Sequence, residues 1–252
     1  MNQDRRSQIV KMLNKQHTIT NSELMETFKI SIETVRRDLA YLESQGLLER
    51  VYGGAVKKNF MNTEPEYTNR QAENLDEKQD IAKEAEKLID LNDTVFFDIG
   101  TTTLSLAQNL NSSKNIKAFT NSLRVATSLS EKGCEVIVTG GKVRNGEFSV
   151  SGFIAENNMS QFNFDKAIIG IAGIDENGIT DFIPEEANLR RQIIKNSRKT
   201  SVLADYTKFG VRAICNICAL SDIDILITDE KAPADTLKKF EKSGIKVIIA
   251  KR

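Results

Sequence analysis

Residues 98–103 combine amino-acid types that suit the binding of a small anion. Asp98-Ile99-Gly100-Thr101-Thr102-Thr103 stands where an apolar run ends and a helical pattern begins. Glycine lets the backbone approach a ligand, threonine hydroxyls form hydrogen bonds, and the free N–H groups of a helix start favour negative charge. A phosphate would fit there, with Asp98 accepting from sugar hydroxyls. The segment lacks the Gly-Lys-Thr ending of a P-loop and the spaced glycines of a dinucleotide fingerprint, so a plain threonine cap is the alternative.

Polar or glycine residues also follow other predicted strands, among them Asn121, Gly141, Asp205 and Lys208. Open parallel sheets bind ligands along the edge formed by the carboxyl ends of their strands. Each of these positions alone is more often a turn or a cap. Together they predict one site for a polyhydroxylated anion at that edge.

The elements that would position these residues alternate along the chain from residue 76 onward. Short apolar runs rich in Val and Ile, without polar alternation, predict strands buried on both faces at 94–98, 116–120, 135–139, 166–171, 200–204, 223–228 and 246–250. An amphipathic pattern predicts a helix at 76–90. Between the strands we expect helices near 102–110, 122–132, 152–160, 185–197 and 233–243. This alternation predicts an α/β fold, a Rossmann-like domain with a mostly parallel sheet.

Residues 1–58 have a different pattern, that of three short helices followed by a hairpin. The first helix is predicted near 5–14, and Thr20 to Glu23 form a capping box that opens the second. Ser31 is a suitable N-cap for a third helix that runs to about residue 45. The stretch 47–56, with Gly53 and Gly54 at its turn, predicts a small β-wing.

The third helix has an apolar face for packing and a polar face that suits DNA. Val35, Leu39 and Leu42 share one side at 100° per residue, which leaves the N-terminal end of the other side to Ser31, Glu33, Thr34, Arg36 and Arg37. Arginine can bond guanine through two atoms, and a recognition helix places this end in the major groove. The wing residues Arg50 and Lys57 could reach phosphates. A generic three-helix domain with a solvated charged face is the alternative, which the order of cap, turn, basic helix and Gly-Gly wing makes less favourable.

Composition is that of an ordinary globular chain of 252 residues, with 40% hydrophobic and 28% charged residues and no net charge. Residues 1–58 hold ten Lys or Arg against seven Asp or Glu, a net of +3. We therefore expect a winged helix-turn-helix at 1–58, a linker at 59–75 and an α/β domain at 76–252. The sequence has no pattern of a signal peptide or a membrane span, and its three cysteines do not make a disulfide framework, which together predict a cytoplasmic protein.

The N-terminal segment resembles the DeoR family of bacterial repressors. The resemblance rests on Ile32-Glu33-Thr34-Val35-Arg36-Arg37-Asp38-Leu39, followed by Leu42-Glu43, Gly46-Leu47, Arg50 and Tyr52-Gly53-Gly54-Ala55. It implies a DNA-binding transcriptional repressor of a sugar-metabolism operon, relieved or modulated by a phosphorylated sugar. The implied partners are a double-stranded DNA operator, the sugar phosphate and further copies of the chain, as a dimer or tetramer.

The remainder resembles the sensor domain of the same family, whose fold is related to ribose-5-phosphate isomerase. The resemblance covers nearly the whole chain, with matches at Asp98-x-Gly-Thr-Thr102, Thr120-Asn121, Gly140-Gly141, Glu185-Glu186-Ala187, Leu203-Ala204-Asp205 and Lys208-Phe209-Gly210. It implies that the effector contacts are Asp98, Gly100, Thr101, Thr102, Asn121, Gly141, Asp205 and Lys208. Tyr206-Thr207 departs from the family pattern, which has Ser before the Lys.

Two other functions are open to this sequence. A sugar-phosphate isomerase needs a catalytic base, and the stretch 177–184 lacks the Lys and the glycine run that resembling enzymes use, so we expect no enzyme activity and no catalytic residues. The spacing of Cys215-Asn216-Ile217-Cys218 is compatible with a zinc site. Zinc sites commonly need a second such pair or histidines, and the only other Cys and His in the sequence are Cys134 and His17. We expect buried thiols, no metal and no cofactor.

Overall fold

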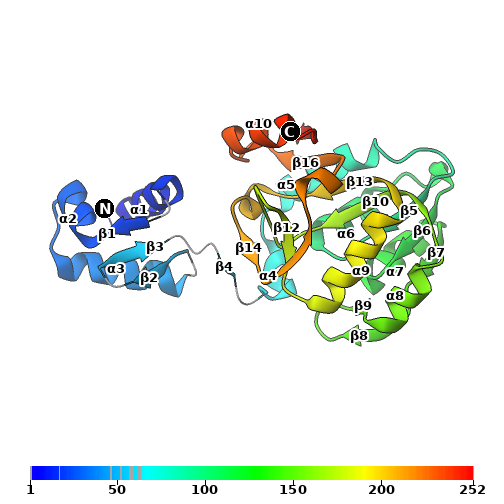
Figure 1. Ribbon diagram of the computed structural model, residues 1–252, viewed down its shortest axis with the longest axis horizontal. Helices are drawn as coiled ribbons and strands as arrows, with labels where there is room; N and C mark the ends of the chain where they lie inside the picture. The colour runs from blue at the N-terminus through cyan, green and yellow to red at the C-terminus, as the bar shows by residue number, and fades with distance from the viewer. Residues whose placement is uncertain are drawn as a thin grey trace. The chain divides into compact units, whose positions relative to one another are not determined.

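The computed structural model describes residues 2–16, 18–45, 47–51, 53–56, 60–61 and 64–251. The chain separates into two compact units, Met1–Asn59 and Phe60–Arg252. Figure 1 shows the helices and strands that make up each unit.

The N-terminal unit is a winged helix-turn-helix. Its elements are α1 (Asn2–Gln16), β1 (Thr18–Thr20), α2 (Asn21–Phe28), α3 (Ile32–Ser44), β2 (Glu49–Val51) and β3 (Gly54–Val56). The predicted capping box is confirmed, since Thr20 Oγ1 accepts from the Glu23 N–H at 3.1 Å while Glu23 accepts from the Thr20 N–H at 2.7 Å. Lys29, in the left-handed conformation, ends α2 and turns the chain into α3. The strands form an antiparallel sheet in the order β1-β3-β2, in which β1 was not predicted.

The core of the N-terminal unit lies under the apolar face of α3, as predicted. Val35, Leu39 and Leu42 are buried against residues of α1, α2 and the sheet. Asp38 is also buried on this side, and its carboxylate accepts from Arg5 Nε at 2.7 Å and Arg6 Nε at 2.8 Å. These bonds hold α1 against α3, so the exposed side of α3 has a fixed orientation in the unit.

The C-terminal unit is built on a seven-stranded parallel sheet in the order β17-β16-β13-β10-β5-β6-β7. Every strand of this sheet was predicted. Their bounds are β5 (Thr94–Phe97), β6 (Lys117–Thr120), β7 (Glu135–Val138), β10 (Phe164–Gly170), β13 (Ser197–Leu203), β16 (Ile225–Asp229) and β17 (Lys246–Ala250).

Helices cover both faces of this sheet. On one face α5 (Leu75–Glu86), α6 (Thr101–Asn109) and α7 (Leu123–Glu131) enclose one apolar core. On the other face α8 (Phe153–Met159), α9 (Pro184–Lys195) and α10 (Ala234–Lys242) enclose a second. Neighbouring residues of β5 point to opposite cores, with Val95 in one and Phe96 in the other. Because both faces of these strands are buried, their sequences are unbroken runs of apolar residues.

Several short elements were not predicted. A small sheet joins β11 (Gly173–Asp175), β12 (Gly178–Asp181) and β15 (Cys215–Cys218). A hairpin joins β8 (Lys142–Arg144) to β9 (Ser149–Ser151), and β4 (Phe60–Met61) pairs with β14 (Arg212–Ala213). The 3-10 turns are η1 (Ser112–Lys114), η2 (Tyr206–Lys208) and η3 (Leu220–Asp222).

The expected linker over 59–75 is wrong for most of its described length. Residues 64–74 belong to the C-terminal unit, where α4 (Tyr67–Ala72) buries Tyr67 to 7% exposure. Arg70 of α4 contacts Glu64 at 3.0 Å and also contacts Glu147 of the hairpin turn. Ion pairs and one aromatic anchor therefore hold a segment whose sequence has no hydrophobic period.

Within the part of the chain that the structure describes, no helix has both the length and the apolar character to span a membrane.

Candidate functional site

The candidate DNA-contacting residues lie at the start of α3. Ser31 is the N-cap, and its hydroxyl accepts from the Thr34 N–H at 3.4 Å. Glu33, Arg36 and Arg37 are exposed, and neither arginine has an ion-pair partner among the described residues. Two free guanidinium groups on one exposed helix start can bind phosphate or guanine.

The wing residues differ from this pattern. Arg50 is tied to the end of α3, because its Nε lies 2.7 Å from Glu43 Oε2 and its backbone N–H donates to Glu43 Oε1 at 3.0 Å. Its charge is thus already balanced, which makes it a weaker candidate for a phosphate contact than the α3 arginines. Lys57 lies outside the described residues.

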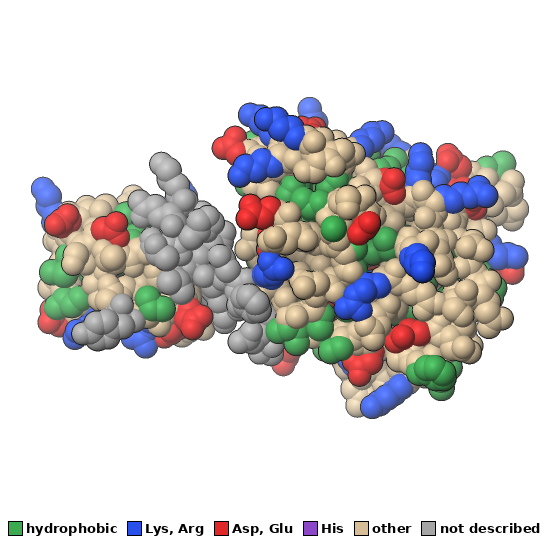
Figure 2. Space-filling model, in the orientation of Figure 1, with side chains coloured by type: hydrophobic (Ala, Val, Ile, Leu, Met, Phe, Trp, Pro, Cys, Tyr) green, Lys and Arg blue, Asp and Glu red, His purple; other side chains and the backbone are tan. Residues whose placement is uncertain are grey.

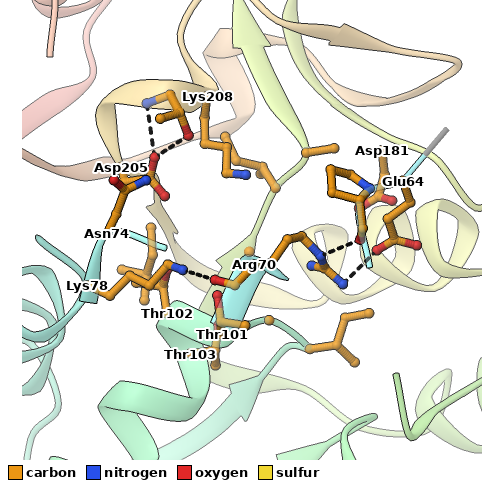
Figure 3. A pocket seen from close by; sticks show the side chains of 18 of the residues that line it. Glu64, Arg70, Asn74, Lys78, Thr101, Thr102, Thr103, Asp181, Asp205 and Lys208 are labelled. Carbon is orange, nitrogen blue, oxygen red and sulfur yellow. Dashed lines mark hydrogen bonds and ion pairs between the residues drawn. The ribbon is translucent and has the colours of Figure 1, made fainter. Parts of the chain in front are cut away.

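A cavity in the C-terminal unit opens at the carboxyl ends of β5, β10 and β13. Figure 3 shows that its labelled residues come from separate segments of the chain. They are Glu64 and Arg70 before and in α4, Asn74 and Lys78 around the start of α5, Thr101–Thr103 at the start of α6, Asp181 at the end of β12, and Asp205 and Lys208 after β13. Of the predicted effector contacts, the structure brings Gly100, Thr101, Thr102, Asp205 and Lys208 together here.

The floor of this cavity is the N-terminus of α6. Gly100 precedes the helix with φ of +139°, a conformation that side-chain-bearing residues rarely adopt. The first N–H groups of an α-helix have no partner within the helix and carry partial positive charge. The Thr103 hydroxyl is buried and has no hydrogen-bond partner among the described residues. The helix start thus presents several unused donors to whatever occupies the cavity.

Cationic side chains face the same cavity. Lys78 is 4% exposed, and its Nζ donates to the backbone oxygens of Glu73, at 2.6 Å, and Arg70. Burial lowers the pKa of Lys78, while the negative charge of Asp205 opposes that shift. An anion in the cavity would favour the charged form of this amine. Lys208 lies across the cavity on η2, with Asp205 as the cap of that turn.

Asp98 lies beneath the cavity and is fully buried, unlike the expected direct contact. Its Oδ2 accepts from the Gly170 N–H at 3.1 Å and from Arg190 Nε. Arg190 also pairs with Asp181, so one guanidinium joins two carboxylates below the cavity wall. Burial raises the pKa of Asp98, although Arg190 opposes that shift. Asp98 therefore orients Arg190 and the Gly170 backbone rather than lining the cavity itself.

Asn121 and Gly141 are not brought to this cavity. Asn121 is buried after β6, and its backbone oxygen accepts from the Val150 N–H of β9 at 2.7 Å. Gly141 has φ of +112°, and a Cβ there would lie 2.9 Å from the Ser151 oxygen. The close packing of the chain before β8 against β9 therefore explains why residue 141 is a glycine.

Other residues of the cavity were not among the predicted effector contacts, chiefly Arg70, Lys78, Asp181 and Arg190. A signal was present for two of them. Lys78 lies three residues before Ile81, on the apolar stripe of α5. Arg190 likewise shares the buried face of α9 with Ala187 and Ile193. A charged residue at a buried position of a helix needs a partner or a function. Arg70 carried no such signal, because α4 is too short to show a period.

The buried network under the cavity continues to the hairpin through Glu186. Its Oε1 accepts from Ser149 Oγ at 2.6 Å and lies 3.0 Å from Arg144 Nε. Arg144 in turn pairs with Glu64 at 2.6 Å. Burial raises the pKa of Glu186 to about 7, against the influence of Arg190 and Arg144. The network therefore contains a carboxyl group that changes its charge near neutral pH.

We expect the free energy of unfolding to depend on pH through Glu186. Because the folded-state pKa is above the unfolded one, its contribution is full below about pH 4.5 and is lost as the pH rises through about 7. The wild-type protein should thus lose up to about 3 kcal/mol relative to Glu186→Gln over that window. Denaturant unfolding at several pH values measures this, with the exposed neighbour Glu185→Gln as control. A wild-type curve parallel to that of Glu186→Gln would contradict the assignment.

The cysteines are free and half-buried. Cys215 and Cys218 lie on β15, and burial raises the pKa of Cys218 to about 12, which keeps its thiol protonated. The described residues contain no group of three or more side chains placed to hold a metal ion. His17 lies outside the described residues.

Comparison with known proteins agrees with this division into two units. Residues 5–59 match the family model of the DeoR-like helix-turn-helix domain, and residues 73–230 match that of the DeoR C terminal sensor domain. The second match alone covers more than half of the chain.

Curated relatives match over nearly their whole length. The HTH-type transcriptional regulator GolR of Listeria innocua is 35% identical, over 98% of each chain. The putative aga operon transcriptional repressor of Escherichia coli O157:H7 is 34% identical, over 98% of this chain and 93% of its own. The glycerol-3-phosphate regulon repressor of Escherichia coli K12 is 34% identical, over 93% of both.

Among solved structures, ribose 5-phosphate isomerase A of Methanocaldococcus jannaschii aligns with 54% of this chain and 55% of its own, at 15% identity and a TM-score of 0.41. The relatives that match along the full length are transcriptional regulators and not enzymes. On the family matches and these relatives, the chain belongs to the DeoR family of DNA-binding transcriptional regulators, with an N-terminal helix-turn-helix and a C-terminal sensor domain.

Proposed function

We propose that the chain represses a sugar-metabolism operon in the cytoplasm and that a phosphorylated sugar, bound in the cavity of the C-terminal unit, relieves or modulates this repression. The relatives named for the aga operon and for the glycerol-3-phosphate regulon support the physiological setting. One observation supports this ligand class. The same cavity is lined by hydrogen-bond donors and cations that suit an anion, and by carboxylates that can accept hydrogen bonds from sugar hydroxyls.

The anion end of the ligand would lie on the start of α6. The N–H groups of residues 101–103, their threonine hydroxyls, and the amines of Lys78 and Lys208 supply donors and positive charge there. A phosphate dianion is favoured at such a helix start over a neutral sugar. Asp98 supports this end from below through the Gly170 backbone.

The sugar end would lie against the acidic side chains of the cavity. Asp181, Glu64 and Asp205 line it and have carboxylate oxygens that accept hydrogen bonds from hydroxyl groups. Arg190 partly balances the charge of Asp181, and Arg70 that of Glu64, so a neutral polyol can approach these two carboxylates without an unpaired buried charge.

Coupling to DNA would run through the segment that follows the N-terminal unit. Residues 60–61 form β4 and pair with β14, and Glu64, Arg70 and Asn74 then line the cavity. A ligand that contacts this segment can favour one arrangement of it over another, by no more than its difference in affinity for the two. At the other end, we propose that Ser31, Glu33, Thr34, Arg36 and Arg37 contact the operator as part of a homo-oligomer.

We expect a thermal-shift screen to reveal the ligand class. Triose, pentose and hexose phosphates are compared with the same sugars without phosphate. A phosphorylated ligand at about 100 times its Kd should add about 2.7 kcal/mol to the free energy of unfolding and raise the Tm. A shift with unphosphorylated sugars of equal size would contradict the anion site.

Lys208→Ala should abolish at least about half of that shift, because it removes a cation that faces the cavity. Loss of one charged contact is expected to weaken binding by roughly 10- to 100-fold. Lys238→Ala is the matched control, since Lys238 is an exposed lysine of α10 away from the cavity. Equal ligand responses in the two variants would remove Lys208 from the site.

A further inference from the structure

A lysine amine joins the anion end of the cavity to residues 64–74, which we call the α4 segment. Lys78 Nζ donates to the backbone oxygens of Glu73, at 2.6 Å, and of Arg70, at the C-terminal end of α4. Figure 3 shows this amine directed at the backbone of Arg70, and Thr101 and Thr102 line the same cavity. One positive charge is therefore available both to the α4 segment and to an anion at the start of α6.

The amine of Lys78 has one donor left over. An ammonium group has three N–H donors, and the α4 segment takes two of them. The third has no partner among the described residues, although Lys78 is only 4% exposed. A buried donor of this kind favours an acceptor from the cavity that Lys78 lines. Burial also lowers the pKa of Lys78, so an anion that keeps the amine charged would strengthen its two bonds to the α4 segment.

The α4 segment is otherwise attached mainly by polar contacts. Glu64 pairs with Arg144 at 2.6 Å, and Arg70 pairs with Glu147 of the hairpin turn. Tyr67 is the only residue of the segment that is buried. A segment with so few buried apolar contacts can open while the sheet and its helices stay folded. Its position is therefore sensitive to the strength of each polar contact, including the two bonds from Lys78.

We propose that Lys78 couples ligand binding to the α4 segment: an anion at the start of α6 accepts from the third N–H of Lys78 and thereby stabilises the closed position that the segment has in this structure. The inference rests on the proposed anion site and gives its effect a direction. By linkage, a change that opens the segment must weaken the binding of the anion.

Closure of the α4 segment would serve both halves of the proposed function. Glu64 and Arg70 line the cavity, so their contacts with a sugar are made only when the segment is closed. The segment also follows β4 in the chain, at the start of the C-terminal unit. Ligand binding that closes it therefore acts on the part of this unit that is connected to the DNA-binding unit.

Hydrogen–deuterium exchange of the full chain tests the proposal, with inorganic phosphate as the probe and chloride at equal ionic strength as the reference. The N–H groups of Arg70 and Glu73 each donate to a backbone oxygen one turn earlier, at 3.1 Å, so they exchange when α4 opens. The Kd of phosphate is taken from the concentration dependence of the Tm. At about ten times that Kd, exchange at residues 70–73 should slow about tenfold, because phosphate that binds only the closed form reduces the open population by that factor.

Two variants separate Lys78 from the other attachments of the segment. Lys78→Met keeps the length of the side chain without its charge, so it should speed exchange at residues 70–73 at least about tenfold and abolish the effect of phosphate. Glu147→Gln weakens a contact of Arg70 at a residue that does not line the cavity. It should also speed exchange, but phosphate should still slow it about tenfold. Lys83→Met, at an exposed lysine of the same helix, is the control and should behave like the wild type.

The outcomes separate this inference from the proposed function. If phosphate raises the Tm of the wild type while residues 70–73 exchange as before, the anion site stands and closure of the segment is overturned. If phosphate does not shift the Tm at any concentration, the anion site fails and this inference fails with it. If Lys78→Met keeps the full slowing by phosphate, the assignment to Lys78 is wrong. The wild-type measurement needs no variant, and circular dichroism shows whether Lys78→Met is folded.

Discussion

Arg190→Ala is expected to lower the free energy of unfolding by about 3–5 kcal/mol, the usual cost of removing one partner from a buried ion pair. Arg190 is 2% exposed and contacts Asp98 and Asp181, with Glu186 at 4.0 Å. Without the guanidinium these carboxyl groups remain buried with no compensating charge. They would have to take up protons, admit water or separate, and each of these costs free energy.

The neighbouring residue provides the control for this prediction. Arg191 is exposed and donates to the Asn216 carbonyl oxygen at 2.8 Å, so Arg191→Ala should cost less than about 1 kcal/mol. Denaturant unfolding of the two variants and the wild type measures the difference. Similar losses for both would mean that the buried network contributes little. Arg190→Lys retains a charge but cannot contact two carboxylates with one planar group, and we expect it to fall between the wild type and the alanine variant.

The main sheet and its helices could be predicted from the sequence because each element has its own signal. Strands such as β10 and β16 are buried on both faces and read as apolar runs, while helices such as α5 show apolar positions at helical spacing. The missed elements have no such signal. β1 has three residues and pairs with β3, more than thirty residues later in the chain, so only tertiary contact defines it. α4 has six residues and one buried side chain, Tyr67.

The candidate effector site could be predicted in part, for a reason that lies in the order of the strands. Thr101, Thr102, Asp205 and Lys208 follow β5 and β13, which are separated by β10 alone. Asn121 follows β6, and Gly141 follows β7. At about 4.8 Å per strand, β7 lies roughly 19 Å from β13, which is beyond the reach of one sugar phosphate. Local sequence does not reveal the order of the strands in the sheet. It therefore cannot tell which strand ends lie close enough together to share one ligand.

The cavity residues that were missed come from helices and from the segment before them. Lys78 and Arg190 reach the cavity from α5 and α9, which were predicted as helices with their apolar faces on the sheet. Arg70 and Glu64 reach it because the segment 64–74 folds back onto the C-terminal unit. Their contributions depend on packing between distant segments, which periodicity and motif spacing do not encode.

The largest expected effect on activity is that of Arg36→Ala/Arg37→Ala on operator binding. Both side chains are exposed at the start of α3, and both are free of ion pairs among the described residues. Each arginine that contacts a base or a phosphate is expected to contribute about 1–3 kcal/mol. The double variant should therefore bind its operator roughly 30-fold to more than 10,000-fold more weakly. Its Tm should stay near that of the wild type, because neither side chain is buried.

The measurement must distinguish an effect of where these charges lie from an effect of how many there are. Lys11→Ala removes a positive charge from an exposed position of α1, on another helix of the same unit, and it is compared with Arg37→Ala. Fluorescence anisotropy with the upstream region of the regulated operon, and with a scrambled duplex, gives the specificity ratio for each variant. Arg37→Ala should lose specific affinity more than non-specific affinity if it reads a base. If it contacts only phosphate, both affinities should fall alike and the salt slope should decrease by about 1. Equal effects of the Lys11 and Arg37 variants on specific binding would mean that the start of α3 is not the reading surface.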